Sequence, residues 1–235
     1  MKQEDADLRR KSVNLIEEIK NNRILLFTLL CSAVYLLWFF WLEQHVTNNY
    51  HIIHAGLDDY IPFCAYFIVP YLLWFPYVLL NWIYLYHSDK EAAKRLSIFL
   101  FTGMFATLFF CTIYPNGTNF RPAVNPQQNI FTFLVAKLYA ADTPTNVLPS
   151  IHVFNSIGVH AAVMRAKAFR DKPWARHASL VLCILICLST MFLKQHSSVD
   201  VMTACLMAYA VYGAVYEPVT AEELAERRAF RKLRT

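Results

Sequence analysis

Long apolar segments alternate with short charged ones along this chain of 235 residues. A helix needs about 20 mostly apolar residues to cross the core of a bilayer. The candidate segments are residues 24–42, 61–86, 96–114, 149–165, 178–193 and 199–216. This pattern predicts an all-α, polytopic membrane protein with six transmembrane helices.

Several segments and connections refine this layout. The second span contains Pro70 and Pro76, which predict a kink that neighbouring helices can tolerate in lipid. The first apolar run is too long for the core of a signal peptide, so we expect it to be retained. Residues 7–21 alternate apolar and charged side chains, which predicts a short interfacial or cytoplasmic helix. The long connection 115–148 includes a predicted amphipathic helix over residues 130–139.

Composition agrees with a chain whose solvent is partly lipid. Apolar residues make up 57% of the chain and charged residues only 17%, whereas soluble domains carry about 25% charge. The net charge is +5, but no basic run is interleaved with aromatic residues as single-strand binding requires. We therefore do not expect a nucleic-acid partner.

The placement of basic residues predicts the orientation in the membrane. Nineteen of the 22 Lys and Arg residues lie in the N-terminal segment, the second and fourth connections and the C-terminal tail. The other three are Arg121, Lys137 and Lys194. Because Lys and Arg concentrate on the cytoplasmic side, both termini are expected in the cytoplasm.

The layout divides the chain into three parts. Residues 1–23 are a cytoplasmic N-terminal segment, residues 24–216 form the six-helix membrane catalytic domain, and residues 217–235 are a basic cytoplasmic tail. We expect an integral protein of the plasma (inner) membrane.

Three polar clusters fall at the outer ends of the last spans. They are Arg121-Pro122, residues 148–152 and residues 194–200. Ionisable groups near the membrane are costly and usually mark function. The topology places all three clusters on the extracytoplasmic side, which predicts an active site there.

The third cluster contains a histidine and a carboxylate at i, i+4. If a helix begins near His196, Asp200 lies on the same face and can accept a hydrogen bond from one ring nitrogen. This bond fixes the tautomer and leaves the other nitrogen able to attack an electrophile. The alternative is an interfacial histidine that caps a helix.

The other two clusters suit a phosphate ligand. Pro149 and Ser150 look like a helix start with proline in the first turn, whose N–H groups can bind an anion. The Ser150 hydroxyl would add a donor, and His152 would act as general acid. Arg121 could clamp phosphate oxygens with both ends of its guanidinium, and Lys194 could neutralise the same phosphate. The alternatives are a helix N-terminus with an interfacial histidine, a surface arginine and a lysine that anchors the helix end.

A metal site has weaker support. His51 and His54 are spaced i, i+3 in the first outer loop, but spacing fixes no further ligand. We expect ordinary interfacial residues there.

Taken together, the clusters resemble the type-2 phosphatidic acid phosphatase superfamily, which comprises membrane lipid phosphatases and phosphotransferases. That family has three ordered motifs: a Lys followed seven residues later by Arg-Pro, then Pro-Ser-any-His, then Ser-Arg, five residues, His, three residues and Asp. The matching residues are Arg121-Pro122, Pro149-Ser150-Ile151-His152, and Ser189, His196 and Asp200.

The resemblance implies a role for each matched residue. His196 would be the nucleophile that forms a phosphohistidine, Asp200 would orient it, and His152 would serve the leaving group and then the acceptor. Arg121 and Ser150 would hold phosphate oxygens. The family needs no metal or other cofactor, so none is expected.

Two positions depart from the family pattern. Tyr114 stands where the first motif has Lys, and Thr190 stands where the third has Arg. Two phosphate-binding cations are therefore missing, and Lys194 is the candidate to replace one of them. This combination is similar to the branch that includes inositol-phosphorylceramide synthases.

The leading expectation is a metal-independent lipid phosphatase, a phosphoric ester hydrolase of phospholipid metabolism, with a lipid phosphate as substrate and membrane lipids around it. The alternatives are a phosphotransferase that moves a phospho-headgroup between lipids and a non-catalytic binder or transporter of lipid phosphates.

Overall fold

The computed structural model describes residues 22–217 and is mostly helical. The helix expected over residues 7–21 and nearly all of the basic tail lie outside the described residues. Long apolar helices make this a membrane protein, as the hydropathy pattern predicts.

Within the described residues, five helices are long and apolar enough to cross a membrane. They are α2 (Arg23–His45), α4 (Ile68–Ser88, preceded by the 3₁₀ turn η1, Ala65–Phe67), α5 (Lys90–Ile113), α8 (Pro173–Phe192) and α9 (Ser198–Tyr216). The fourth predicted span is α7 (Ile151–Arg165), which is shorter and is joined to α8 through η2 (Lys167–Phe169). The predicted helix in the long connection is α6 (Ile130–Ala141).

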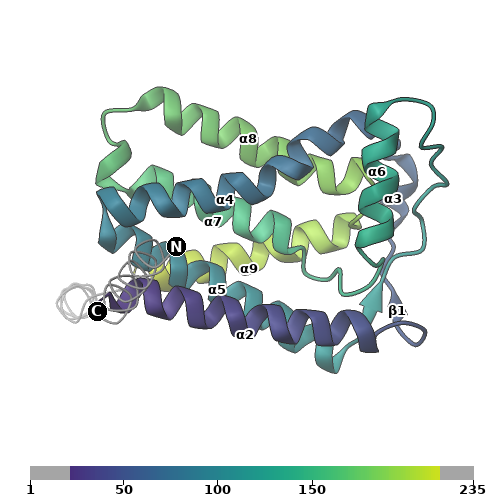
Figure 1. Ribbon diagram of the computed structural model, residues 1–235, viewed down its shortest axis with the longest axis horizontal. Coiled ribbons are helices and arrows are strands. Elements are labelled where there is room, and N and C mark those ends of the chain that lie inside the picture. The colour runs from purple at the N-terminus through teal and green to yellow at the C-terminus, as the bar shows by residue number, and fades with distance from the viewer. Residues whose placement is uncertain (1–21, 218–235) are drawn as a thin grey trace, which may run out of the picture.

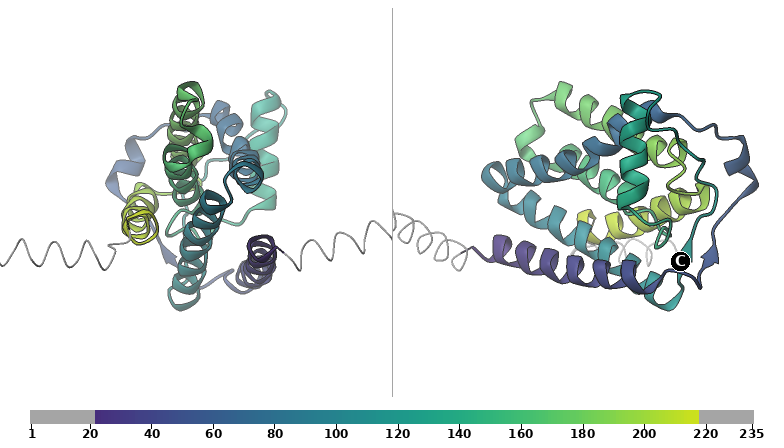
Figure 2. Two further views of the ribbon diagram at one scale, coloured as in Figure 1. Left: turned by 90° about the vertical axis from the view of Figure 1, so that its left-hand side faces the viewer. Right: turned by 45° about the vertical axis from the view of Figure 1, so that its right-hand side comes forward.

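The spanning helices and α7 lie side by side, and α6 stands across them at one end of the molecule (Figure 1). The short helix α3 (Gly56–Tyr60) and strand β1 (His51–Ile52) lie at this same end, which we call the α6 end. Helix α2 begins, and α9 finishes, at the opposite end. Figure 2 shows α2 standing apart from the rest of the bundle, and its packing is mainly with α5.

Helix α7 is the centre of the bundle. It contacts α4, α5, α8 and α9, and its polar side chains Asn155 and Ser156 are buried among them. The polarity of this segment therefore reflects contact with protein on most sides instead of with lipid.

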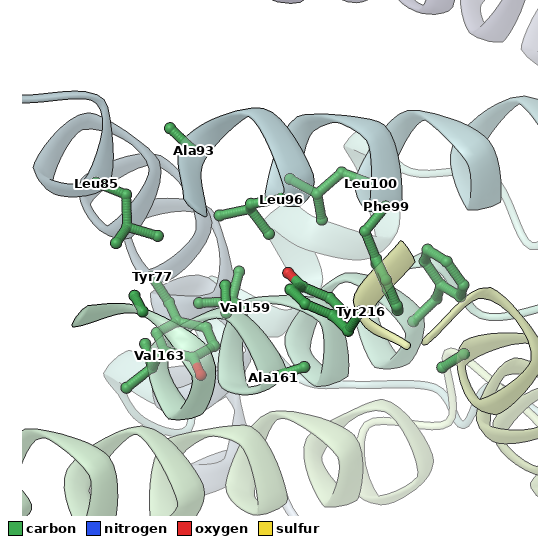
Figure 3. Close-up of a cluster of buried hydrophobic side chains, with 14 of the residues drawn as sticks. Tyr77, Leu85, Ala93, Leu96, Phe99, Leu100, Val159, Ala161, Val163 and Tyr216 are labelled. Carbon is green, nitrogen blue, oxygen red and sulfur yellow. The ribbon is translucent and has the colours of Figure 1, made fainter. Parts of the chain in front are cut away.

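The core between α5 and α7 is aromatic and tightly packed. Phe99 of α5 and Phe154 of α7 are fully buried and stack with ring centroids 4.7 Å apart. Figure 3 shows Leu96 of α5 lying over Val159 of α7, and Phe99 pointing from α5 toward the same helix. A Cβ atom on Gly158 would lie 2.4 Å from the Phe99 ring, so the missing side chain is what lets the two helices approach.

A small sheet and one amide set the path of the chain into α7. Strand β1 pairs in parallel with β2 (Asn116–Gly117), with His51 opposite Asn116. The fully buried Asn116 accepts hydrogen bonds at Oδ1 from Val147 N (3.0 Å) and Leu148 N (2.9 Å). One side chain thereby satisfies two backbone donors that have no helix or strand to pair with.

We expect Gly158→Ala to lower the free energy of unfolding by about 1–3 kcal/mol, because the added methyl overpacks against Phe99. Gly213→Ala in α9 is the matched control, since a Cβ there meets nothing within 4 Å and a helical Gly→Ala change is stabilising by up to about 1 kcal/mol. Thermal unfolding of both variants in detergent, followed by circular dichroism, measures the difference. Equal effects of the two substitutions would contradict this packing.

Candidate active site

His196 and Asp200 form a hydrogen-bonded pair at the start of α9. His196 Nδ1 lies 3.2 Å from Asp200 Oδ2, and Asp200 is fully buried. The sequence predicts this pair on one helical face, but α9 begins only at Ser198, so His196 precedes the helix. The two side chains meet because Asp200 reaches back to the N-cap in a capping box, in which its Oδ2 accepts from Ser197 N at 2.9 Å.

The geometry assigns the two nitrogens of His196 different tasks. An ionised carboxylate can only accept hydrogen bonds, so Nδ1 carries the proton that faces Asp200. Nε2 is then left unprotonated and available to another partner.

His152 faces His196 from the first turn of α7. The two ring centroids are 5.9 Å apart. Two aromatic rings of α4 hold the His152 ring, Tyr71 at 4.5 Å and Trp74 at 4.3 Å between centroids. The second and third sequence clusters therefore meet across one space.

Ser150 is the N-cap of α7. Its Oγ accepts from Val153 N at 3.4 Å, and its own N–H donates to Asp200 O at 3.3 Å. The sequence predicts proline in the first turn, but α7 begins at Ile151, so Pro149 lies before the cap. The fully buried Ser150 thus joins the start of α7 to α9, and its role as a phosphate donor stays a prediction.

The guanidinium of Arg121 is largely engaged by protein. Nη1 donates to Asp142 O at 2.7 Å, and Nη2 donates to Thr143 O at 3.0 Å and to Gln195 Oε1. Nε is buried and has no partner among the described residues. Burial lowers the pKa of Arg121, and the nearby Asp142 carboxylate partly opposes this shift. A clamp through both Nη atoms, as the sequence suggests, would require these contacts to change.

Lys194 is bound by backbone carbonyls in and next to α3. Its Nζ donates to Asp58 O at 2.7 Å and to Ile61 O, and its backbone has φ of 54°. Of the two readings of Lys194, these contacts favour the anchor of the helix end over a phosphate ligand.

Sequence reasoning missed Asp58, which organises the loop that carries His196. Asp58 is only 4% exposed; it accepts from Ser197 Oγ at 2.5 Å, from Ser198 N at 2.7 Å and from Ala55 N at 2.9 Å. Burial alone would raise the pKa of Asp58, but these hydrogen bonds hold it below its ordinary value. The available signal was a pair of adjacent carboxylates, Asp58 and Asp59, in the connection between the first two apolar segments.

A cavity of about 600 Å³ connects the histidines to the apolar interior. Its polar end includes His152, His196, Arg121, Gln195, Glu43, Asp142 and Asn155. Its body is lined by apolar and aromatic side chains of α2, α4 and α5, such as Phe39, Trp74 and Phe101. Ser150 and Lys194 are not among the described residues that line it. The space is therefore polar at the histidines and apolar along the helices.

The two positions that depart from the family pattern have other contacts. The Tyr114 ring stacks on His51 with centroids 4.3 Å apart. The fully buried Thr190 accepts at its carbonyl from Gln195 N (3.0 Å) and His196 N (3.1 Å). His54 pairs with Asp59 at 2.8 Å, and no group of three or more metal-ligating side chains occurs within residues 22–217.

No family model matches the chain, and neither a curated protein nor a solved structure matches it. The chemistry of the site therefore has to be argued from its own geometry.

We expect Asp58→Asn to lower the midpoint of thermal unfolding and to speed hydrogen exchange at the amides of Ser197 and Ser198, because it removes a carboxylate that accepts three bonds. The free energy of unfolding should fall by about 1–3 kcal/mol. Asp59→Asn is the control, since the Asp59 side chain is 66% exposed.

The effect of Asp58→Asn should depend on pH. Because the folded-state pKa of Asp58 is lowered, its stabilisation is present above the ordinary carboxyl pKa and disappears as the pH falls through the lowered value. The wild type and Asp58→Asn should thus converge in acid. A difference in stability that stayed constant down to low pH would contradict the role given to this carboxylate.

Proposed function

We propose that this protein is an integral-membrane lipid phosphatase that works through a phosphohistidine intermediate on His196. The observation that carries the proposal is the His196–Asp200 pair, which faces His152 in a cavity with a polar end and an apolar body. The resemblance of the three motifs to the type-2 phosphatidic acid phosphatase superfamily supports the same chemistry.

In the first step, His196 Nε2 attacks the phosphorus of a lipid phosphate. A P–N bond forms, the P–O bond to the lipid breaks, and the leaving oxygen takes a proton from His152. The proton on Nδ1 stays shared with Asp200, which stabilises the positive charge on the ring. In the second step, His152 takes a proton from water, the oxygen attacks phosphorus, and cleavage of the P–N bond releases phosphate and restores His196.

The size and lining of the cavity are the reason that we propose an amphiphilic substrate. Its volume lies within the range of about 300–1,000 Å³ that is usual for small-molecule sites. A phosphate at the histidines would leave its lipid chain along the aromatic and aliphatic side chains of α2, α4 and α5. We place this site on the extracytoplasmic face of the plasma (inner) membrane, with six spans and both termini in the cytoplasm, on the distribution of Lys and Arg.

Lipid phosphate labelled with ³²P should transfer its label to the protein, and the label should be acid-labile and base-stable as expected of a phosphohistidine. His196→Ala should abolish the labelling and lower turnover about a thousandfold or more, because no other group replaces the nucleophile. His177→Ala is the matched control, since His177 is exposed and its Nδ1 is hydrogen-bonded to Pro173 O in its own helix.

Unchanged turnover in His196→Ala would show that the mechanism is wrong. Binding of lipid phosphates or vanadate without labelled enzyme or product would instead favour a non-catalytic binder or transporter.

A second candidate function is transfer of a phospho-headgroup between lipids. The charge of the cavity favours it: among the described lining residues Arg121 is the sole Lys or Arg, while Glu43 and Asp142 are both carboxylates. A doubly charged phosphomonoester is less well compensated there than a singly charged phosphodiester. In transfer, a lipid alcohol would replace water in the second step.

With a phosphodiester lipid as donor and a long-chain alcohol or diacylglycerol as acceptor, transfer predicts a new phospholipid in preference to free phosphate ester. Glu43→Gln should then shift the ratio of phosphomonoester to phosphodiester turnover upward by about tenfold, because it removes one negative charge from the cavity. Thin-layer separation of labelled products measures both quantities. Release of the head group to water alone, at every acceptor concentration, would exclude transfer.

A further inference from the structure

Gln195 lies directly before His196 and is held in one orientation. Its side chain lines the polar end of the cavity and is only 1% exposed. Arg121 Nη2 donates to its Oε1. Because a guanidinium can only donate, the amide group that faces Arg121 must be the carbonyl oxygen, so the NH₂ group faces away from Arg121.

That NH₂ group is not used by the protein. Gln195 Nε2 is buried and has no hydrogen-bond partner within residues 22–217. Arg121 Nε is in the same condition. Unpaired buried donors are costly and rare in native structures. Nε1 of Trp74, another lining residue, is also without a partner among the described residues, and three such donors beside one cavity point to a ligand that carries acceptor oxygens.

The backbone fixes the position of Gln195 as firmly as it fixes that of His196. Both N–H groups donate to Thr190 O, at 3.0 Å for Gln195 and 3.1 Å for His196. The side chains of Gln195 and His196 therefore extend from the same backbone turn, which is anchored at the Thr190 carbonyl. The proposed nucleophile and the unpaired donor occupy adjacent positions in the sequence.

We propose that the side-chain amide of Gln195 is a phosphate-binding group that donates from Nε2 to a non-bridging oxygen of the substrate phosphate, together with Arg121 Nε. The inference rests on the proposed function and adds a binding residue to it. Gln195 supplies a neutral donor in a site where the matching family positions, Tyr114 and Thr190, provide no cation. A donor to a non-bridging oxygen strengthens its bond as charge builds on the phosphate oxygens.

A simpler role for Gln195 would be to hold Arg121 in place, and a double-mutant cycle separates the two roles. If Gln195 acted only through Arg121, its replacement would have no further effect once Arg121 is Met. If it binds phosphate itself, its replacement should weaken binding by a similar factor in both backgrounds. Gln195→Met keeps the length of the side chain and removes both the donor and the acceptor.

The probe is inorganic orthovanadate, an analogue of the phosphoryl group in transfer, titrated against the purified full-length protein in detergent. We expect Gln195→Met to raise the dissociation constant about 10- to 100-fold, and to do so again in the Arg121→Met background. Gln128→Met is the matched control, because Gln128 is exposed in the outer loop, and it should leave the constant unchanged. Thermal unfolding of each variant identifies any that fail to fold. If Gln195→Met fails to fold, Gln195→Asn and Gln195→Ala are compared instead. Gln195→Asn keeps the amide and should therefore bind vanadate more tightly than Gln195→Ala.

The outcomes separate this inference from the proposed function. Wild-type protein that binds vanadate while Gln195→Met binds it equally well, or loses affinity only when Arg121 is present, would overturn the role of Gln195 and leave the phosphohistidine mechanism standing. Wild-type protein that neither binds vanadate nor becomes labelled by lipid phosphate would overturn the proposed function itself.

Discussion

The rest of the site depends on the buried carboxylate of Asp200. One oxygen accepts from both His196 Nδ1 and Ser197 N, so the bond that orients the histidine also caps α9. The backbone carbonyl of the same residue accepts from Ser150 N and ties the start of α7 to α9. Because no water competes in a fully buried position, these bonds are stronger and more directional than they would be at a surface. The first turn of α9 thus orients His196 and joins the starts of two helices, and the same contacts bring His152 opposite His196.

The helices were predictable from hydropathy, but their bounds were not. Apolar residues define how much of a helix lies in lipid, whereas capping and backbone bonding define where it begins. Helix α5 begins at Lys90, where Asp89 caps it by accepting from Ala92 N at 3.2 Å, although the apolar run starts only at Leu96. In the sequence, the only sign of the central position of α7 is its unusual polarity. A helix surrounded by protein needs less apolar surface than one surrounded by lipid.

The site was predictable where its contacts are local. The pairing of His196 with Asp200 follows from a spacing of four residues and survives even though the helix starts later than expected. The contact of Asp58 with Ser197 joins residues 139 positions apart, and neither local sequence predicts it. The direction of Lys194 depends on a left-handed backbone conformation that the sequence does not signal in a lysine. Spacing identifies candidates for chemistry, but the path of the loops decides which of them face one another.

The two ends of the cavity differ in the side chains that line them, and this difference would suit the proposed lipid substrate. At the α6 end, Leu42 is the buried residue of α2, and the adjacent Glu43 accepts from Thr143 Oγ1 at 2.6 Å and Asn146 Nδ2 at 2.8 Å. The rest of α2 presents large apolar side chains outward and packs mainly on α5. Hydrogen bonds of Thr28 with Ser97 Oγ (3.0 Å) and of Trp38 Nε1 with Thr112 Oγ1 (3.0 Å) keep one side of α2 on α5, and its other side is apolar. Apolar contacts with lipid or with a substrate chain are nearly equivalent in energy, so an apolar chain beside α2 would replace lipid at little cost. The geometry of the two histidines is therefore set by hydrogen bonds at one end, and under the proposed function the apolar side chains along α2 would set the tolerance for the length and shape of a lipid chain.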